Sequence, residues 1–321
     1  MALAAATGAG VARLEPGEGT WQVELTARDT GVSCLARDPR DPGFLLGGAR
    51  GGGVWRSGDG GESWERLDLP QPDVISVAVG GADGAVYAGC EPSMLFVSHD
   101  RGERWEELAS LREIPSAPTW SFPPRPWTSH VRWIAPSPHD AGLLLVGIEL
   151  GGVMRSEDGG KTWSDHRPGA QPDCHSLAWH PSANGRAYEA GGGGAAWSAD
   201  GGETWDAADE GRDRDYTWAV AVDPADPDCW FVSASTGPFA AHGRRPAEAV
   251  VYRWRGSGPW EPLSGGLPQP LDEMPYALAF ADDVLAAGLA DGTIYATRDR
   301  GDSWEQVRLE GEAPPRILAF A

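Results

Sequence analysis

The 321-residue sequence predicts an all-β fold, a seven-bladed β-propeller of four-stranded antiparallel blades. The first observation behind this prediction is a tryptophan that recurs with gaps of 43, 41, 58, 42, 55 and 44 residues. A period of about 40 residues is typical of propeller blades. The seven positions are Trp21, Trp64, Trp105, Trp163, Trp205, Trp260 and Trp304.

The second observation is that the repeat closes on itself. Counting from Trp304 through the C-terminus and in again from the N-terminus to Trp21 gives 38 residues, close to the other gaps. A ring requires this, because its last blade must meet its first. We therefore expect one domain over residues 1–321, whose closing blade combines residues 1–27 with 315–321. Its inner strand would be 316–320, and its other strands 2–6, 10–14 and 21–25.

Within each repeat, short apolar runs follow one another in the same order. A repeat begins with a run that we expect to be the innermost strand of a blade, for example residues 75–79 or 218–222. A turn, a second run, a glycine-rich link, a third run and a polar turn follow, and the tryptophan then leads the fourth run. The 44 glycines and 27 prolines fall at these turns, as an all-β array requires.

The polar turn before the tryptophan has the pattern Ser-x-Asp-x-Gly-x-Ser/Thr-Trp, or a close variant, in five of the seven repeats. Aspartate can accept hydrogen bonds from backbone N–H groups of the turn, glycine can take a positive φ, and tryptophan can pack on the neighbouring blade. These roles are structural, so we assign the motif to the scaffold. The five copies begin at Ser57, Ser98, Ser156, Ser198 and Thr297.

This motif resembles the Asp-box, or BNR, repeat of the sialidase-like superfamily. The repeat occurs in sialidases, xyloglucan-active hydrolases, Vps10-type receptors and photosystem assembly factors, so the resemblance implies the propeller fold but no particular activity. The sequence lacks the Arg-Ile-Pro motif of sialidases. The segment Phe-Pro-Pro-Arg-Pro at 122–126 is only distantly similar to that motif and lies at a different position in the chain. Xyloglucan-active relatives resemble two propellers around a cleft, which one ring cannot form.

The composition of the chain limits the classes of partner that it could bind. The formal net charge of −21 argues against nucleic acid and anionic membrane surfaces, and it fits the basic surfaces of photosystem assembly factors badly. Four cysteines are too few for a disulfide framework. The N-terminal segment lacks the basic residues of a signal peptide, and no apolar run is long enough to cross a membrane. We therefore expect a soluble, cytoplasmic protein.

Strand order places the unusual parts of the chain on one face of the ring. We call the face where inner strands begin and second strands end the upper face. The two longest gaps between tryptophans contain insertions at about 109–128 and 236–249, and both fall on this face. Functional loops on rigid scaffolds cluster in this way, so we expect the functional site there.

The candidate catalytic residues are His130 and His175, near the start of two inner strands, and Glu149 and Glu189, near the end of two second strands. In a hydrolase or lyase acting on a sugar-like substrate, the two glutamates would share acid and base roles. Arg132 would hold an anionic or hydroxyl-rich group, and aromatic rings would stack on the sugar. The substrate-binding candidates are Trp120, Arg125, Trp127, Arg132, Asp173 and Tyr216.

Two other functions fit the same residues. His130 and His175 with Glu149 or Asp173 offer two imidazoles and a carboxylate, a donor set suited to a divalent metal such as zinc or iron. Alternatively, the aromatic and proline-rich insertion would anchor a protein partner on a non-catalytic binding face. A small polar molecule or carbohydrate is the preferred ligand, because acids and histidines are poor material for the core of a protein interface. His242, in the second insertion, would cap the site.

Overall fold

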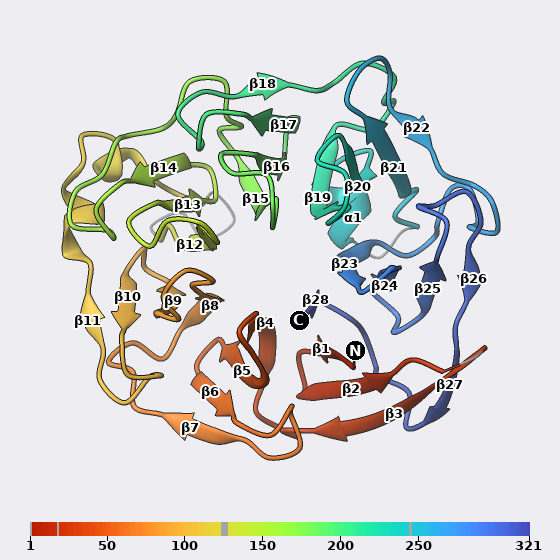
Figure 1. Cartoon of the computed structure of the whole chain (residues 1–321), viewed down its shortest axis with the longest axis horizontal. Helices are drawn as coiled ribbons and strands as arrows, with labels where there is room; N and C mark the ends of the chain where they lie inside the picture. Colours follow the sequence, from red (N-terminus) through yellow and green to blue (C-terminus); the bar gives the residue numbers. More distant parts are fainter. Residues whose placement is uncertain (1, 18, 123–127, 244–245) are drawn as a thin grey trace.

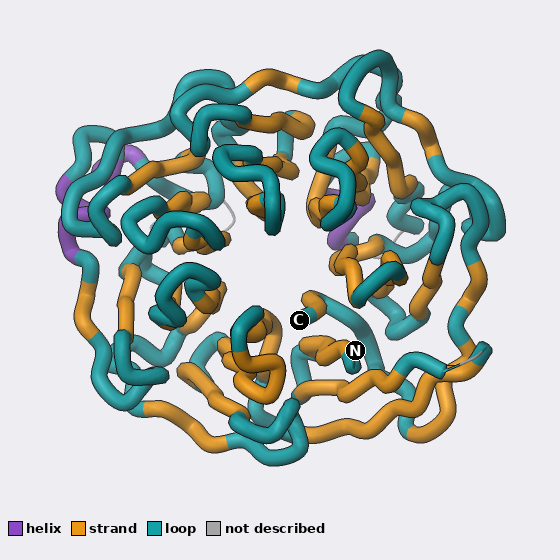
Figure 2. The backbone as a smooth tube through the Cα atoms, viewed as in Figure 1, coloured by secondary structure: helices purple, strands orange, loops and turns teal. Residues whose placement is uncertain are grey.

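The computed structural model is a ring of seven β-sheets (Figures 1 and 2), which confirms the seven-bladed propeller. It describes residues 2–17, 19–122, 128–243 and 246–321. Six blades follow one another along the chain with the first strand of each innermost, and the seventh blade joins the two ends of the chain (Figure 1).

The strands of the six consecutive blades have the following bounds. Blade 1 contains β4 (Val32–Asp38), β5 (Asp41–Ala49), β6 (Gly53–Ser57) and β7 (Glu65–Leu67). Blade 2 contains β8 (Val74–Val79), β9 (Val86–Cys90), β10 (Leu95–Ser98) and β11 (Glu106–Glu107). Blade 3 contains β12 (Val131–Pro136), β13 (Leu144–Ile148) and β14 (Gly152–Ser156). Blade 4 contains β15 (Cys174–Trp179), β16 (Ala187–Gly191), β17 (Gly194–Ser198) and β18 (Asp206–Ala207). Blade 5 contains β19 (Tyr216–Val222), β20 (Cys229–Ser235), β21 (Val250–Arg255) and β22 (Glu261–Pro262). Blade 6 contains β23 (Pro275–Ala281), β24 (Val284–Leu289), β25 (Ile294–Thr297) and β26 (Glu305–Gln306).

The closing blade joins both ends of the chain as predicted. Its inner strand β28 (Ala319–Phe320) pairs antiparallel with β1 (Leu3–Ala6), and β2 (Val11–Glu15) and β3 (Thr20–Thr26) follow outward. The ladder of β28 is shorter than the predicted 316–320. A fifth strand, β27 (Arg308–Gly311), runs parallel to β3 on the outside, which the sequence did not predict.

Blade 3 also differs from the four-stranded expectation. Its sheet has three strands, and the place of the fourth is taken by an isolated bridge between Arg155 and Ser164. The insertion that precedes this blade forms two short 3-10 helices, η1 (Ala109–Glu113) and η2 (Ala117–Thr119). The second insertion contains the helix α1 (Pro238–His242). Within the described part of the chain, no helix has the length and hydrophobicity needed to span a bilayer.

Adjacent blades are locked together by glycines in second strands. A Cβ at Gly89 would lie 2.5 Å from a side-chain atom of Val131, and one at Gly147 would lie 2.4 Å from the sulfur of Cys174. Val131 and Cys174 are the first residues of the next inner strands, so each inner strand packs on the bare backbone of the preceding blade. In the same way, Val74 packs on Gly48 and Ile317 packs on Gly288.

The repeated polar turn forms one hydrogen-bonded unit. In blade 3, Ser156 Oγ donates to Asp158 Oδ1 at 2.8 Å and accepts from the backbone N–H of Gly160 at 2.8 Å. Asp158 accepts from the backbone N–H of Thr162 at 2.9 Å and from its hydroxyl at 2.6 Å. These bonds favour the ionised carboxylate and lower the pKa of Asp158 to about 2. Gly160 has a φ of +89°, and the indole of Trp163 donates to its carbonyl at 3.1 Å.

We predict that Ser156→Ala destabilises the protein by about 1–3 kcal/mol, because it leaves the buried N–H of Gly160 without an acceptor. Urea unfolding at neutral pH measures this free energy. Ser257, exposed in the turn before Trp260, gives the matched control Ser257→Ala, which should change stability by less than about 0.5 kcal/mol. Equal effects of the two substitutions would contradict a stabilising role for the turn.

Candidate functional site

A cavity of about 950 Å³ lies in the middle of the ring, lined mainly by the inner strands β4, β8, β12, β19 and β23. Residues of α1 and of the segment 316–320 complete its wall. This volume is within the range of small-molecule sites, which are usually apolar with a few convergent polar groups. The lining has this character, since most of it is aliphatic or aromatic and the charged groups gather at the upper end of the strands.

β-Bulges direct side chains into this cavity. In all six consecutive blades, the inner strand carries one extra residue near its start relative to the second strand. A bulge turns the extra side chain away from the regular alternation of the strand. The bulged residues are Ser33, Ile75, Arg132, His175, the pair Trp218 and Ala219, and Tyr276. All of these except His175 line the cavity, and His175 lies just behind its wall.

Glu149 is the centre of a charged network at the upper end of the cavity. One of its oxygens, Oε2, lies 2.6 Å from His130 Nε2 and 3.7 Å from Arg132 Nε. The other nitrogen of His130 lies 3.5 Å from Glu91, which in turn forms an ion pair with Arg50 at 2.8 Å. Burial raises the pKa of Glu149, but the hydrogen bond with His130 and the charge of Arg132 outweigh it and bring the pKa to about 2. Glu149 is therefore ionised at neutral pH.

His175 is held in one tautomer. Its Nδ1 lies 2.6 Å from the carbonyl oxygen of Thr217, which can only accept, so Nδ1 carries the proton. Its Nε2 is buried without a hydrogen-bond partner among the described residues, and the nearest acidic oxygen, Asp173 Oδ2, is 3.4 Å away. Asp173 Oδ1 accepts from the backbone N–H of Leu150 at 3.3 Å. Leu150 has a φ of +55°, a strained conformation for a branched residue, and such strain clusters at functional sites.

Aromatic rings form one wall of the cavity. The guanidinium carbon of Arg132 lies 4.5 Å from the centre of the Trp218 ring, a cation–π arrangement. The ring of His175 packs behind the same wall, 4.6 Å from Trp218 and 4.8 Å from Tyr216, measured between ring centres. The burial of Tyr216 and the nearby Asp173 carboxylate raise its pKa, so its hydroxyl remains protonated.

His242 links α1 to this wall. Tyr276 donates its hydroxyl hydrogen to the carbonyl of Ala241, so its oxygen accepts from His242 Nδ1, at 2.9 Å in both cases. His242 Nε2 is then the acceptor for the hydroxyl of Tyr216 at 2.8 Å. This chain requires neutral His242, and desolvation together with the positive charge of nearby groups lowers its pKa to about 4. His242 lines the cavity, in the position proposed from the sequence.

The structure does not bring Glu189 into the cavity. Its side chain is fully buried between blades, where Oε2 accepts from the backbone N–H of Gln171 at 2.9 Å. Burial raises its pKa to about 8, even though the N–H of Gln171 and the thiol of Cys174 both donate to it. The predicted pairing of Glu149 with Glu189 therefore has no counterpart in the cavity, where Asp173 is the carboxylate beside Glu149.

The aromatic insertion is divided between core and cavity. Trp120 was predicted to bind substrate, but it packs in the hydrophobic core of blades 2 and 3 and donates its indole hydrogen to Ser116 Oγ at 3.0 Å. Phe122 does line the cavity, with its ring centre 5.3 Å from that of His130. Arg125 and Trp127, the other two predicted substrate-binding residues of this segment, lie outside the described residues.

Four cavity residues were missed by the sequence analysis, namely Arg50, Trp218, Tyr276 and Arg316. Trp218 and Tyr276 occupy bulge positions equivalent to that of Arg132. Arg132 and Tyr276 are each the second residue of their inner strand, so an alignment of the inner strands on their first residues would have paired these two, whereas Trp218 is the third residue of its strand and would have been displaced by one. Arg50 and Arg316 carry no such signal, because they lie in links between strands.

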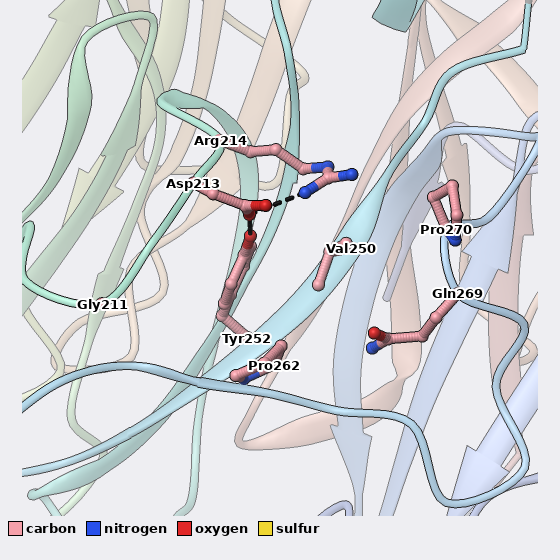
Figure 3. Close-up of a pocket in the computed structure, with 8 residues that line it drawn as sticks. All are labelled: Gly211, Asp213, Arg214, Val250, Tyr252, Pro262, Gln269 and Pro270. Atoms are coloured by element: carbon pink, nitrogen blue, oxygen red, sulfur yellow. Dashed lines mark hydrogen bonds and ion pairs between the residues drawn. The ribbon is translucent and has the colours of Figure 1, made fainter.

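A second, smaller pocket of about 400 Å³ lies beside blade 5 (Figure 3). Asp213 is its main charged group, and it accepts hydrogen bonds from the hydroxyl of Tyr252 and from Arg214 (Figure 3). Arg214 also donates to the carbonyl of Glu248 at 2.5 Å. Because its polar groups satisfy one another, we assign the functional site to the larger cavity.

We predict that the wild-type protein loses stability relative to Glu189→Gln as the pH rises from about 4.5 to 8. His242 contributes a slope of the opposite sign between about pH 4 and 6.5, and because it is present in both proteins this slope cancels in the comparison. The pKa of Glu189 is higher in the folded state than in the unfolded state, so the folded state binds the extra proton in this range. The slope contributed by this one group is about 1.4 kcal/mol per pH unit. Glu189→Gln removes it, because a neutral amide can still accept from Gln171. Urea unfolding of both proteins between pH 5 and 8 measures the difference, and parallel profiles would contradict the prediction.

Comparison with known proteins gives a fold but no family. No family profile matches the chain, and no curated protein matches it in sequence. Among solved structures, the GH74 xyloglucanase of Xanthomonas campestris is 21% identical to this chain, with a TM-score of 0.66. The match covers 99% of this chain and 52% of the xyloglucanase chain. The GH74 enzyme of Niastella koreensis is 16% identical with a TM-score of 0.68, over 94% of this chain and 51% of its own.

A protein of another kind is also similar. The structure of YCF48 bound to D1 peptide is 17% identical with a TM-score of 0.59, and the match covers 86% of this chain and 81% of that one. The chain spans about half the length of these two GH74 enzymes and 38% of an ancestral GH74 enzyme. At such identities the similarity establishes the propeller architecture, which this chain shares with GH74 enzymes and YCF48.

Proposed function

We propose that the central cavity binds a sugar-like, hydroxyl-rich small molecule that carries an anionic group, and that the protein acts on it as a hydrolase or lyase. The observation that supports this most directly is the meeting, in one cavity, of a tryptophan and arginine wall with a cluster of carboxylates and histidines. GH74 enzymes among the similar structures, one of them a xyloglucanase, agree with a carbohydrate-active role.

The wall would bind the ligand. Trp218, Tyr216 and Tyr276 supply aromatic surface on which a sugar ring can stack. Arg132 and Arg316 supply positive charge for an anionic group. Arg132 has only the long contact with Glu149, and Arg316 has no ion pair with any described carboxylate. The volume of about 950 Å³ is enough for one or two sugar units.

The cluster of Glu149, Asp173 and His175 beside this wall would carry the chemistry. Glu149 is ionised, so it is suited to stabilise positive charge or to take up a proton rather than to donate one. Oxygens of Glu149 and Asp173 lie within 4.8 Å of each other and of a nitrogen of His175. This spacing is shorter than the roughly 6.5–9.5 Å that inverting glycosidases need between two carboxyl groups, so a water-separated carboxylate pair is disfavoured.

A second function is favoured by one observation at the rim. Phe239 in α1 is 92% exposed and Leu150 is 41% exposed, and both line the cavity. Exposed apolar side chains at the mouth of a cavity suit a peptide that inserts one residue, and the structure of YCF48 is that of a complex with D1 peptide. This alternative uses the rim, whereas the sugar proposal uses the wall, so variants can separate the two.

We also propose that the chain belongs with the Asp-box propellers and is cytoplasmic. The five hydrogen-bonded turns that begin at Ser57, Ser98, Ser156, Ser198 and Thr297 support the first proposal. The cysteines support the second, since Cys34, Cys90, Cys174 and Cys229 are all free thiols.

We predict that the protein binds acidic sugars such as uronic acids more tightly than neutral xyloglucan oligosaccharides in calorimetric titrations. Trp218→Ala and Arg132→Gln should each weaken binding by roughly tenfold, about 1.4 kcal/mol. Arg186 lies over the ring of Trp197 at 4.1 Å, outside the cavity, so Trp197→Ala and Arg186→Gln are matched controls that should leave binding unchanged.

The same titrations decide between sugar and peptide. Phe239→Ser should leave sugar binding within about twofold, since it alters only the rim. Weak binding of every sugar, together with peptide binding that Phe239→Ser abolishes, would replace the sugar proposal with the peptide one.

A further inference from the structure

We propose that Glu149, Asp173 and His175 form a binding site for one divalent transition-metal ion, such as zinc or manganese, at the upper end of the cavity. The inference deepens the proposed function and rests on it for the location of the reacting group. Ion binding itself can be measured without any sugar.

The geometry of the three side chains fits a shared ion. Each offers one ligand atom, and the three atoms lie within 4.8 Å of one another. An ion placed at the centre of three atoms with that spacing lies within about 2.8 Å of each of them. Shifts of the side chains by well under 1 Å would shorten these distances to the normal bond lengths of about 2.0–2.2 Å. The pair His175 Nε2 and Asp173 Oδ2 needs no shift. Their separation is 3.4 Å, which is the distance expected between two ligands of a tetrahedral ion.

An unpaired nitrogen provides the second, independent observation. His175 is 1% exposed, and its Nε2 has no hydrogen-bond partner in the described part of the chain. A buried polar atom without a hydrogen-bond partner is unfavourable, and bonding to an ion would relieve this. Its Nδ1 donates to the carbonyl of Thr217 at 2.6 Å, so Nε2 keeps its lone pair. Metal-ligating histidines almost always donate their other N–H to such an acceptor.

The surrounding charges set the role of each neighbour. His130 binds Glu149 Oε2 at 2.6 Å, so it would orient this carboxylate from outside and leave the other oxygen for the ion. The set predicted from the sequence was His130 and His175 with Glu149 or Asp173. The proposed set leaves out His130 and uses both carboxylates. One imidazole and two carboxylates suit zinc or manganese better than calcium, which prefers oxygen ligands alone. Three protein ligands leave positions open toward the cavity, as in catalytic sites.

The test is a titration of chelator-treated protein with Zn²⁺, Mn²⁺ and Co²⁺, followed by calorimetry and, for Co²⁺, by visible absorption. The expected result is one equivalent of ion per chain and a Co²⁺ spectrum of mixed nitrogen and oxygen ligation. Absence of saturable binding up to 1 mM of all three ions would overturn the proposal. Should a variant fail to fold, the wild-type stoichiometry and spectrum still decide.

Variants locate the ion. Asp173→Asn and His175→Gln should each weaken binding at least a hundredfold, whereas His130→Gln should weaken it about tenfold, as for a residue that orients a ligand. His139→Gln and Asp206→Asn alter exposed residues outside the cavity and serve as matched controls. Full binding in Asp173→Asn or His175→Gln, or equal losses in His130→Gln and His175→Gln, would overturn this ligand set. Sugar titrations with and without ion show whether the proposed function fails separately.

Discussion

At four junctions between blades, the structure depends on a contact between a residue at or just before the start of an inner strand and a glycine in the second strand of the preceding blade. Val131 packs on Gly89 and Cys174 packs on Gly147, at distances that leave no room for a Cβ. Close packing of this kind fixes the spacing of the blades, because protein interiors tolerate neither voids nor overlaps. At the seam of the ring, Ile317 packs on Gly288 in the same way, so the closing blade obeys the same constraint.

The same region of each inner strand contains the β-bulge that builds the cavity. The extra residue departs from the regular alternation of the strand, and in every consecutive blade except the fourth its side chain lines the cavity. Arg132, Trp218 and Tyr276 reach the cavity by this route from three different blades. The rigid part of the scaffold and the candidate site are thus adjacent in the chain.

Environment gives two glutamates on neighbouring second strands opposite properties. Glu149 faces His130 and Arg132, and its pKa falls to about 2, while Glu189 faces a backbone N–H and a thiol, and its pKa rises to about 8. Both are largely removed from water, so burial alone does not decide their charge. The hydrogen bond with His130 and the positive charge of Arg132 decide it, which makes Glu149 a charged group of the cavity and Glu189 a neutral part of the core.

The sequence by itself determined the architecture. The fold was predicted from the tryptophan period, from the closure of that period across the termini and from the polar turn. These features repeat about every 40 residues, so they can be read directly from the sequence. It also placed His130, Glu149, Asp173, His175 and Tyr216 on the upper face. Only the tertiary structure decided which of these meet, that Trp120 belongs to the core, and that Asp173 rather than Glu189 accompanies Glu149. The reason is that small differences in position decide which side chains reach the cavity. Glu149 follows the last residue of its second strand, whereas Glu189 lies two residues before the end of its own. Which side chains then meet depends on packing between blades that are adjacent in the ring, and sequence periodicity does not record that packing.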